Sequence, residues 1–171
     1  MKLPRPLRDI DTINQLLTGC EREARRLGDA VPGAEHLLLS ALDLPDGTAR
    51  RAFELAGADP DQYRAAISTT HADALRAIGI SADDGAAAPA SVPCPATPAT
   101  GVFRSNASGQ QAFAAAVKLS KATRPAGLLG AHVVVAVCQM ERSTAARALE
   151  TMGIDRAALS AAASAELGTQ R

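Results

Sequence analysis

The chain repeats itself at a constant spacing of 96 residues, and this repeat constrains the fold more than any other feature. The segment 48–59, TARRAFELAGAD, matches the segment 144–155, TAARALETMGID, at seven of twelve positions. The identical positions of the first copy are Thr48, Ala49, Arg51, Ala52, Glu54, Gly57 and Asp59. The same spacing pairs His36 with His132. Because glycine, aspartate, arginine and histidine all recur together, the sequence indicates a duplication and predicts two similar folding units.

Each unit is expected to contain four helices. Apolar residues of the first unit recur at helical spacing after a possible N-cap at Asp11, and Gly28 is a possible end of that helix. The near-continuous apolar run at 37–42 predicts a helix that is buried on several sides. This second helix is predicted near 34–44, and the later helices are predicted near 48–56, 60–78, 108–123, 131–140, 144–152 and 156–167. The residues expected on the inner face of the fourth helix are Tyr63, Ile67, Ala74, Leu75 and Ile78.

Both units use the same residues to stop one helix and start the next. Gly57 and Gly153 follow the third helix of each unit, where glycine commonly ends a helix. Asp59 and Asp155 come two residues later and are predicted N-caps of the fourth helices. The β-branched run 133–137 alone would suit a strand, but its pairing with 37–41 across the repeat favours a helix.

A segment rich in proline and alanine separates the two units. Residues 81–105 hold four of the ten prolines, with small residues between them, which is typical of an extended, semi-flexible linker. We therefore predict an all-α chain with a first repeat at 1–80, a linker at 81–105 and a second repeat at 106–171.

Charge and hydropathy exclude several classes of protein. Eighteen Lys and Arg balance eighteen Asp and Glu, so a phosphate-neutralising surface for nucleic acid is not expected. No apolar run approaches the roughly 20 residues of a membrane span. Residues 1–9 lack the apolar stretch of a secretory signal, so we expect a cytoplasmic protein.

Cysteine and histidine are the residue types in this sequence considered as metal ligands or catalytic residues. Cys20, Cys94 and Cys138 lack metal-ligand spacing, and neither a metal nor another cofactor is predicted. His36 and His132 each stand at a helix start, where a histidine is expected to bond to backbone rather than to catalyse. A hydrolase that uses Cys20, Cys138, His36 or His132 is the remote alternative.

The first unit also resembles a known family. The residues that carry the pattern EAxxLG…VxGxEHLLLxAL…GxAxxxxExxGxD are Glu23-Ala24, Leu27-Gly28, Val31, Gly33, the run 35–39, Ala41-Leu42, Gly47, Ala49, Glu54, Gly57 and Asp59. This pattern resembles the duplicated Clp N-terminal domain, which precedes the AAA+ motor in unfoldases of the ClpA and ClpC type. The resemblance spans about residues 10–78 and 104–168. It implies two tandem four-helix repeats packed as a pseudo-twofold eight-helix bundle, which docks adaptors and substrates.

The departures from the family shape the expected function. The sequence contains no G-x-x-x-x-G-K-[ST] phosphate loop, so no ATPase activity is expected. In ClpC-type domains two glutamates hold phosphoarginine; here Glu35 is kept, but Ala131 replaces the second. The family segment that binds cyclic-peptide antibiotics is echoed around Phe103, and Gln110 stands where a lysine is usual. The resemblance thus gives Glu35, Phe103 and Gln110 as candidate ligand residues.

Together these features predict a stand-alone Clp N-domain protein rather than an enzyme. Its expected partners are Clp unfoldase or protease components, adaptors and substrate proteins or peptides. The alternative is a decoy that sequesters hydrophobic cyclic-peptide antibiotics. Small basic clusters at Arg25-Arg26 and Arg50-Arg51 are interpreted as solvated helix faces or as a docking patch for acidic partners.

Overall fold

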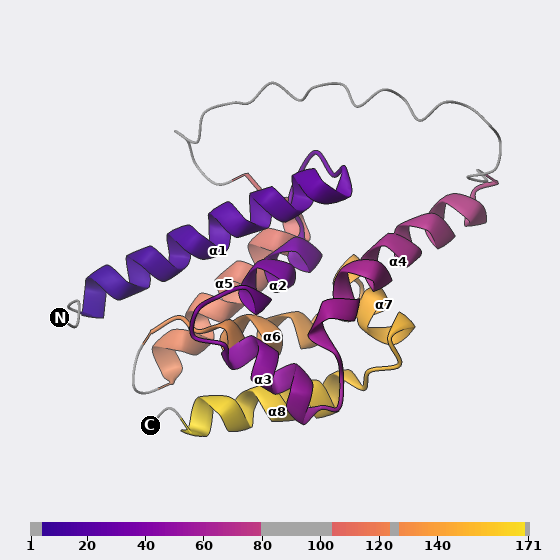
Figure 1. Ribbon diagram of the computed structural model, residues 1–171. Helices are drawn as coiled ribbons and strands as arrows, with labels where there is room; N and C mark the ends of the chain where they lie inside the picture. Colours follow the sequence, from indigo (N-terminus) through magenta and orange to yellow (C-terminus); the bar gives the residue numbers. More distant parts are fainter. Residues whose placement is uncertain (1–4, 80–103, 124–126, 170–171) are drawn as a thin grey trace.

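The computed structural model describes residues 5–79, 104–123 and 127–169, and every regular element in those ranges is a helix (Figure 1). The elements are α1 (Arg5–Leu27), α2 (Ala34–Leu42), α3 (Thr48–Leu55), the 3₁₀ turn η1 (Pro60–Gln62), α4 (Tyr63–Ala77), α5 (Ala107–Ala122), α6 (Gly130–Cys138), α7 (Thr144–Thr151) and α8 (Arg156–Thr169). The prediction of an all-α fold built from two helical quartets is confirmed. The expected linker at 81–105 lies almost wholly outside the described residues, so the division of the chain at those bounds stays a prediction.

The repeat found in the sequence is also a repeat of structure. Adding 96 to the bounds of α2 gives the bounds of α6, and adding 96 to those of α3 gives those of α7. The β-branched run 133–137 lies in α6, which confirms a helix rather than a strand there. The β-branched residues form a helix here because α6 is packed on all sides, and the preference of β-branched residues against a helix is weak.

The two quartets interlock around one core. Every residue of α2 and α6 is buried, and the two helices contact each other at the centre of the molecule. Around them the outer helices exchange partners, because α3 of the first quartet packs on α8 of the second and α4 packs on α7 (Figure 1). Each quartet therefore covers apolar surface of the other, and the described helices form a single pseudo-twofold bundle.

Equivalent residues end and begin the outer helices. Gly57 and Gly153 have φ values of 71° and 70°, a left-handed conformation that suits glycine after a helix. The side chain of Asp59 accepts a hydrogen bond from the N–H of Asp61 at 2.9 Å, and that of Asp155 accepts one from Ala157 at 2.9 Å. The same turn thus redirects the chain in both repeats.

One expectation about a helix start was wrong. Helix α1 begins at Arg5, so Asp11 lies inside the helix and is not its N-cap. Proline suits the first turn of a helix, and Pro6 is the second residue of α1, so the helix extends in front of Asp11.

The inner face expected for α4 ends early. Tyr63 and Ile67 are fully buried, but Leu75 and Ile78 are 47% and 71% exposed, and Ala74 is exposed as well. Figure 1 gives the reason, because the C-terminal end of α4 extends away from the bundle. No described helix is long and apolar enough to cross a membrane.

Candidate functional site

His36 and His132 close the first turns of the two central helices. His36 Nδ1 accepts a hydrogen bond from the N–H of Gly33 at 2.9 Å, and His132 Nδ1 accepts one from Leu129 at 3.0 Å. Each ring therefore satisfies the backbone N–H that stands three residues before it. Burial lowers the pKa of His132 below its ordinary value, against smaller opposing effects of the bond to Leu129 and of Asp46.

Each central helix is also capped by the other quartet. Ala34, at the start of α2, donates its N–H to Ser108 Oγ at 3.2 Å. Ala131, at the start of α6, donates its N–H to Thr48 Oγ1 at 2.9 Å. The adjacent N–H of Gly130 lies 3.1 Å from Asp46 Oδ2. Since these donors have no partner inside their own helix, the bonds tie the two quartets together.

Glu35 lies beside this junction, in the first turn of α2. It is only 5% exposed, and Oε1 lies 3.3 Å from His36 Nδ1. That nitrogen cannot both accept from Gly33 and donate to Glu35; the shorter bond to Gly33, repeated at His132, is the one we assign. Burial raises the pKa of Glu35, and the hydrogen bond from its own backbone N–H lowers it. The charged carboxylate is thus set into the scaffold, not displayed on its surface.

The other candidate ligand residues are placed less favourably for binding. Gln110 is exposed near the start of α5, and its Nε2 already donates to the carbonyl of Ser105 at 2.9 Å. The starts of α2 and α5 are joined by the bond from the N–H of Asn106 to the carbonyl of Pro32, so Glu35 and Gln110 belong to one junction. Phe103 lies outside the described residues. Ala131 is fully buried, and its side chain supplies no carboxylate where the first repeat has Glu35.

The described cysteines are unsuited to nucleophilic chemistry. Burial, followed by the nearby charges of Glu35 and Glu21, raises the pKa of the Cys20 thiol to about 12. Burial likewise raises the pKa of Cys138 to about 12, although Arg156 opposes the shift. A thiol with such a pKa is almost entirely protonated at neutral pH and reacts slowly. Among the described residues no group of His, Cys, Asp and Glu has the arrangement of a metal site.

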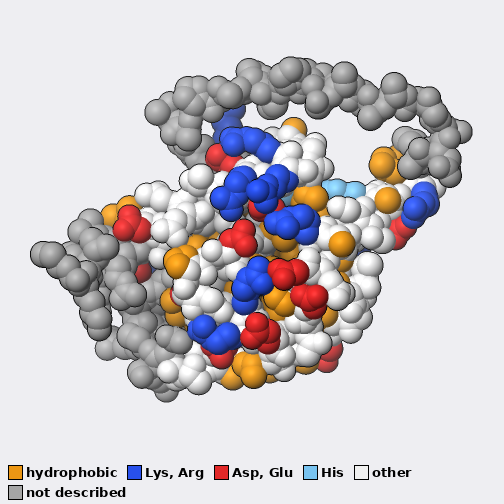
Figure 2. Space-filling view, viewed as in Figure 1, with side chains coloured by type: hydrophobic (Ala, Val, Ile, Leu, Met, Phe, Trp, Pro, Cys, Tyr) orange, Lys and Arg blue, Asp and Glu red, His pale blue; other side chains and the backbone are white. Residues whose placement is uncertain are grey.

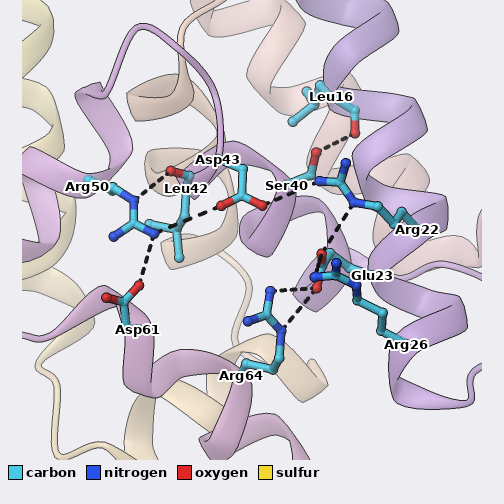
Figure 3. Close-up of polar contacts among 10 residues, drawn as sticks. All are labelled: Leu16, Arg22, Glu23, Arg26, Ser40, Leu42, Asp43, Arg50, Asp61 and Arg64. Carbon is cyan, nitrogen blue, oxygen red and sulfur yellow. Dashed lines mark hydrogen bonds and ion pairs between the residues drawn. The ribbon is translucent and has the colours of Figure 1, made fainter.

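The most prominent polar cluster is centred on Glu23. Glu23 is fully buried, and its carboxylate is surrounded by arginines from α1 and α4 (Figure 3). Arg64 bonds to Glu23 Oε2 at 2.7 and 3.1 Å, and Arg26 Nη1 lies 3.3 Å from Oε1. Arg22 Nε lies 3.7 Å from the same oxygen. Figure 2 shows basic side chains gathered over the C-terminal half of α1, with acidic ones among them.

Sequence reasoning could have found this cluster from one irregularity. Glu23 lies three residues after Cys20 and four before Leu27, on the stripe that faces the core. A charged residue on such a stripe needs buried partners, and arginine is the residue best suited to supply them.

Two shallow grooves open on the surface. The α1–α2 groove has a volume of about 360 Å³. It is lined by Asn14, Gln15, Thr18, Gly19, Arg22, Ser40, Asp43 and Leu44. The α4–α7 groove has a volume of about 330 Å³. It is lined by Thr70, Asp73, Ala74, Ala77, Arg147, Glu150 and Thr151. Volumes near 300 Å³ suit a short stretch of peptide rather than a large ligand.

Comparison with known proteins agrees with this architecture. Residues 11–88 match the family described as the Clp repeat (R) N-terminal domain. The crystal structure of the N-terminal domain of the caseinolytic protease associated chaperone ClpD from Arabidopsis thaliana is similar, with a TM-score of 0.61 and 21% identity. The alignment covers 94% of this chain and 95% of that one. A search of curated proteins gave no match. Residues 11–88 are thus similar to the Clp repeat N-terminal domain family, and the chain as a whole has the Clp N-domain fold.

Proposed function

We propose that this chain is a binding module of Clp proteolysis that docks peptides, substrate proteins or adaptors and has no ATPase or protease activity of its own. The observation that carries the proposal is the Clp N-domain fold over nearly the whole chain, shared with a domain of a caseinolytic protease associated chaperone. The buried, protonated thiols of Cys20 and Cys138 speak against a cysteine hydrolase.

The bundle has the rigidity that such a module needs. The bonds from Ala34 to Ser108 and from Ala131 to Thr48 fix both central helices against the opposite quartet. Helices held in this way present a preformed surface, which lowers the entropy lost when a partner docks.

The α1–α2 groove is the surface that we assign to this docking. Asn14, Gln15 and Thr18 line it with donors and acceptors that suit a peptide backbone. Arg22, at its edge, links the groove to the arginine cluster around Glu23. Arg22 also lies 3.5 Å from Asp43 of the same groove, so the groove offers both a positive and a negative side chain to a partner.

Affinity purification with two matched variants tests the proposal. The purified chain is immobilised and exposed to a lysate of its native cell, and captured proteins are identified by mass spectrometry. We expect Clp unfoldase subunits, adaptors or Clp substrates to be enriched. Thr18→Arg fills the α1–α2 groove and should remove them, whereas Thr169→Arg, an exposed threonine of α8 outside both grooves, should not. Capture that contains no Clp-related protein would overturn the function, and equal capture by Thr18→Arg would overturn the assigned surface.

The candidate ligand residues stay predictions. Glu35→Gln, which keeps the size and removes the charge, tests phosphoarginine binding at the α2–α5 junction by calorimetry. The structure adds no support for capture of cyclic peptides, because the Gln110 amide is occupied by Ser105 and Phe103 lies outside the described residues.

A further inference from the structure

The pseudo-twofold symmetry of the bundle is broken at one ion pair. On the α3–α8 side, Arg51 Nε lies 2.7 Å from Glu166 Oε2, and Arg51 also donates to the carbonyl of Asp46 at 3.2 Å. The spacing of 96 residues places Arg147 of α7 at the position of Arg51 and Thr70 of α4 at that of Glu166. The arginine is therefore kept in both halves, while its carboxylate is present in only one.

The register of the two outer helices supports this correspondence. Tyr63 of α4 and Leu159 of α8 stand 96 residues apart, and both are fully buried. Ile67 and Ala163 form a second such pair, also fully buried. One turn further on, Thr70 is 8% exposed and Glu166 is 9% exposed. Thr70 thus occupies the place of Glu166 with a neutral side chain that cannot form an ion pair with an arginine.

The guanidinium of Arg147 consequently has no hydrogen bond or ion pair with any described residue. Arg147 is exposed and lines the α4–α7 groove together with Thr70. Two carboxylates also line this groove, but each has its own arginine. Asp73 pairs with Arg76, and Glu150 lies 3.8 Å from Arg156.

We propose that the α4–α7 groove binds the carboxylate of an acidic peptide residue, which pairs with Arg147 as Glu166 pairs with Arg51. The inference rests on the proposed function, since it takes the ligand to be a peptide. A guanidinium grips a carboxylate through two parallel bonds, so this arginine selects acidic side chains over neutral ones. Ala74 and Ala77 form an apolar wall of the groove. The matching ligand is a segment in which an acidic residue has apolar neighbours.

Fluorescence anisotropy with a pair of labelled peptides tests the site. The probes are Ac-Ala-Leu-Glu-Leu-Ala-NH₂ and the same peptide with Gln in place of Glu. The chain should bind the Glu peptide about tenfold or more tightly than the Gln peptide, as expected for a charge-assisted pair. Arg147→Gln should remove this preference and leave the thermal midpoint unchanged, because Arg147 has no described partner to lose.

Two further variants exploit the symmetry. Thr70→Glu supplies the missing carboxylate within the chain, so it should occupy Arg147, weaken Glu-peptide binding about tenfold and raise the thermal midpoint. Arg51→Gln is the matched control, which should lower the thermal midpoint by breaking the pair with Glu166 while peptide binding persists. If Thr70→Glu fails to fold, Arg147→Gln alone decides the question.

Two results would overturn the proposal: equal affinity for the two peptides, or undiminished Glu-peptide binding by Arg147→Gln. Either result leaves the proposed function standing if the unmodified chain still captures Clp proteins and Thr18→Arg does not. If the unmodified chain captures no Clp-related protein but still prefers the Glu peptide to the Gln peptide, the proposed function is refuted and the α4–α7 site is not.

Discussion

Replacing Thr48 by Val should reveal how strongly the two quartets depend on each other. Thr48 is 1% exposed, and its hydroxyl accepts the N–H of Ala131, which is fully buried. Valine has nearly the same shape, so the substitution removes this acceptor, together with the bond that the hydroxyl donates to Asp46, without opening a cavity. Leaving a buried donor without a partner costs about 1–3 kcal/mol, and we expect a loss of about 2 kcal/mol in the free energy of unfolding. For a chain of this size such a loss lowers the thermal midpoint by about 4–8 °C.

The repeat supplies a matched control for this experiment. Thr144 is the counterpart of Thr48, but its hydroxyl makes no hydrogen bond with a described residue. Thr144→Val should therefore change the free energy of unfolding by less than about 0.5 kcal/mol. Urea denaturation followed by circular dichroism measures both variants. A loss below about 0.5 kcal/mol in Thr48→Val, or equal losses in the two variants, would refute the conclusion that Thr48 holds the quartets together.

Three other perturbations test the remaining packing and charge arguments. Glu23→Gln should lower the free energy of unfolding by about 1–3 kcal/mol, because a neutral amide replaces the buried carboxylate that three arginines share. Glu21→Gln, at a partly exposed acid that contacts only Arg25 among the described residues, should have little effect in the same urea titration. Gly130→Ala would place its Cβ 2.9 Å from both the Ala41 carbonyl oxygen and Ala49 Cβ, so we expect the free energy of unfolding to fall by about 1–3 kcal/mol. In Gly168→Ala the new Cβ meets nothing within 4 Å, so this control should be neutral or stabilising. Differential scanning calorimetry distinguishes the two variants. The pKa of Cys20 and Cys138 is raised to about 12 in the folded chain and returns to its ordinary value of 9.0 on unfolding. The contribution of the two buried thiols to stability is therefore fully present below pH 9 and is lost as the pH rises towards 12. At about pH 8, iodoacetamide should alkylate both thiols only when the chain is unfolded by urea. Alkylation of either thiol in the folded chain, read by peptide mapping, would contradict their burial.

Much of the local structure could be predicted because short-range chemistry decides it. The glycines at 57 and 153 permit a left-handed turn, and the aspartates two residues later cap the fourth helix of each repeat. The apolar run at 37–42 predicted a helix buried on several sides, and the pairing across the repeat extended the helix assignment to 133–137. The start of α1 was mistaken because Pro6 suits the first turn of a helix that begins before Asp11. The inner face of α4 was mistaken because the C-terminal end of that helix extends away from the bundle.

The identity of the residues that pair around the candidate sites lay beyond sequence reasoning, even at Glu23, where the sequence shows that a partner is needed. Arg51 and Glu166 are separated by 115 residues, and neither position shows in sequence that the two meet. The cluster at Glu23 joins α1 to an arginine 41 residues away. Pairs of this kind form only once helices are packed, because side chains reach just a few ångströms from their own backbone.

The sequence by itself determined the duplication, the helical class and the turns that repeat in both halves, since these depend on local propensity and on identity at a fixed spacing. Only the tertiary structure decided that the quartets interlock, that each caps the other's central helix, and that one of two equivalent arginines lacks a carboxylate. Burial and long-range pairing depend on the positions of all the helices together, and no local stretch of sequence carries that information.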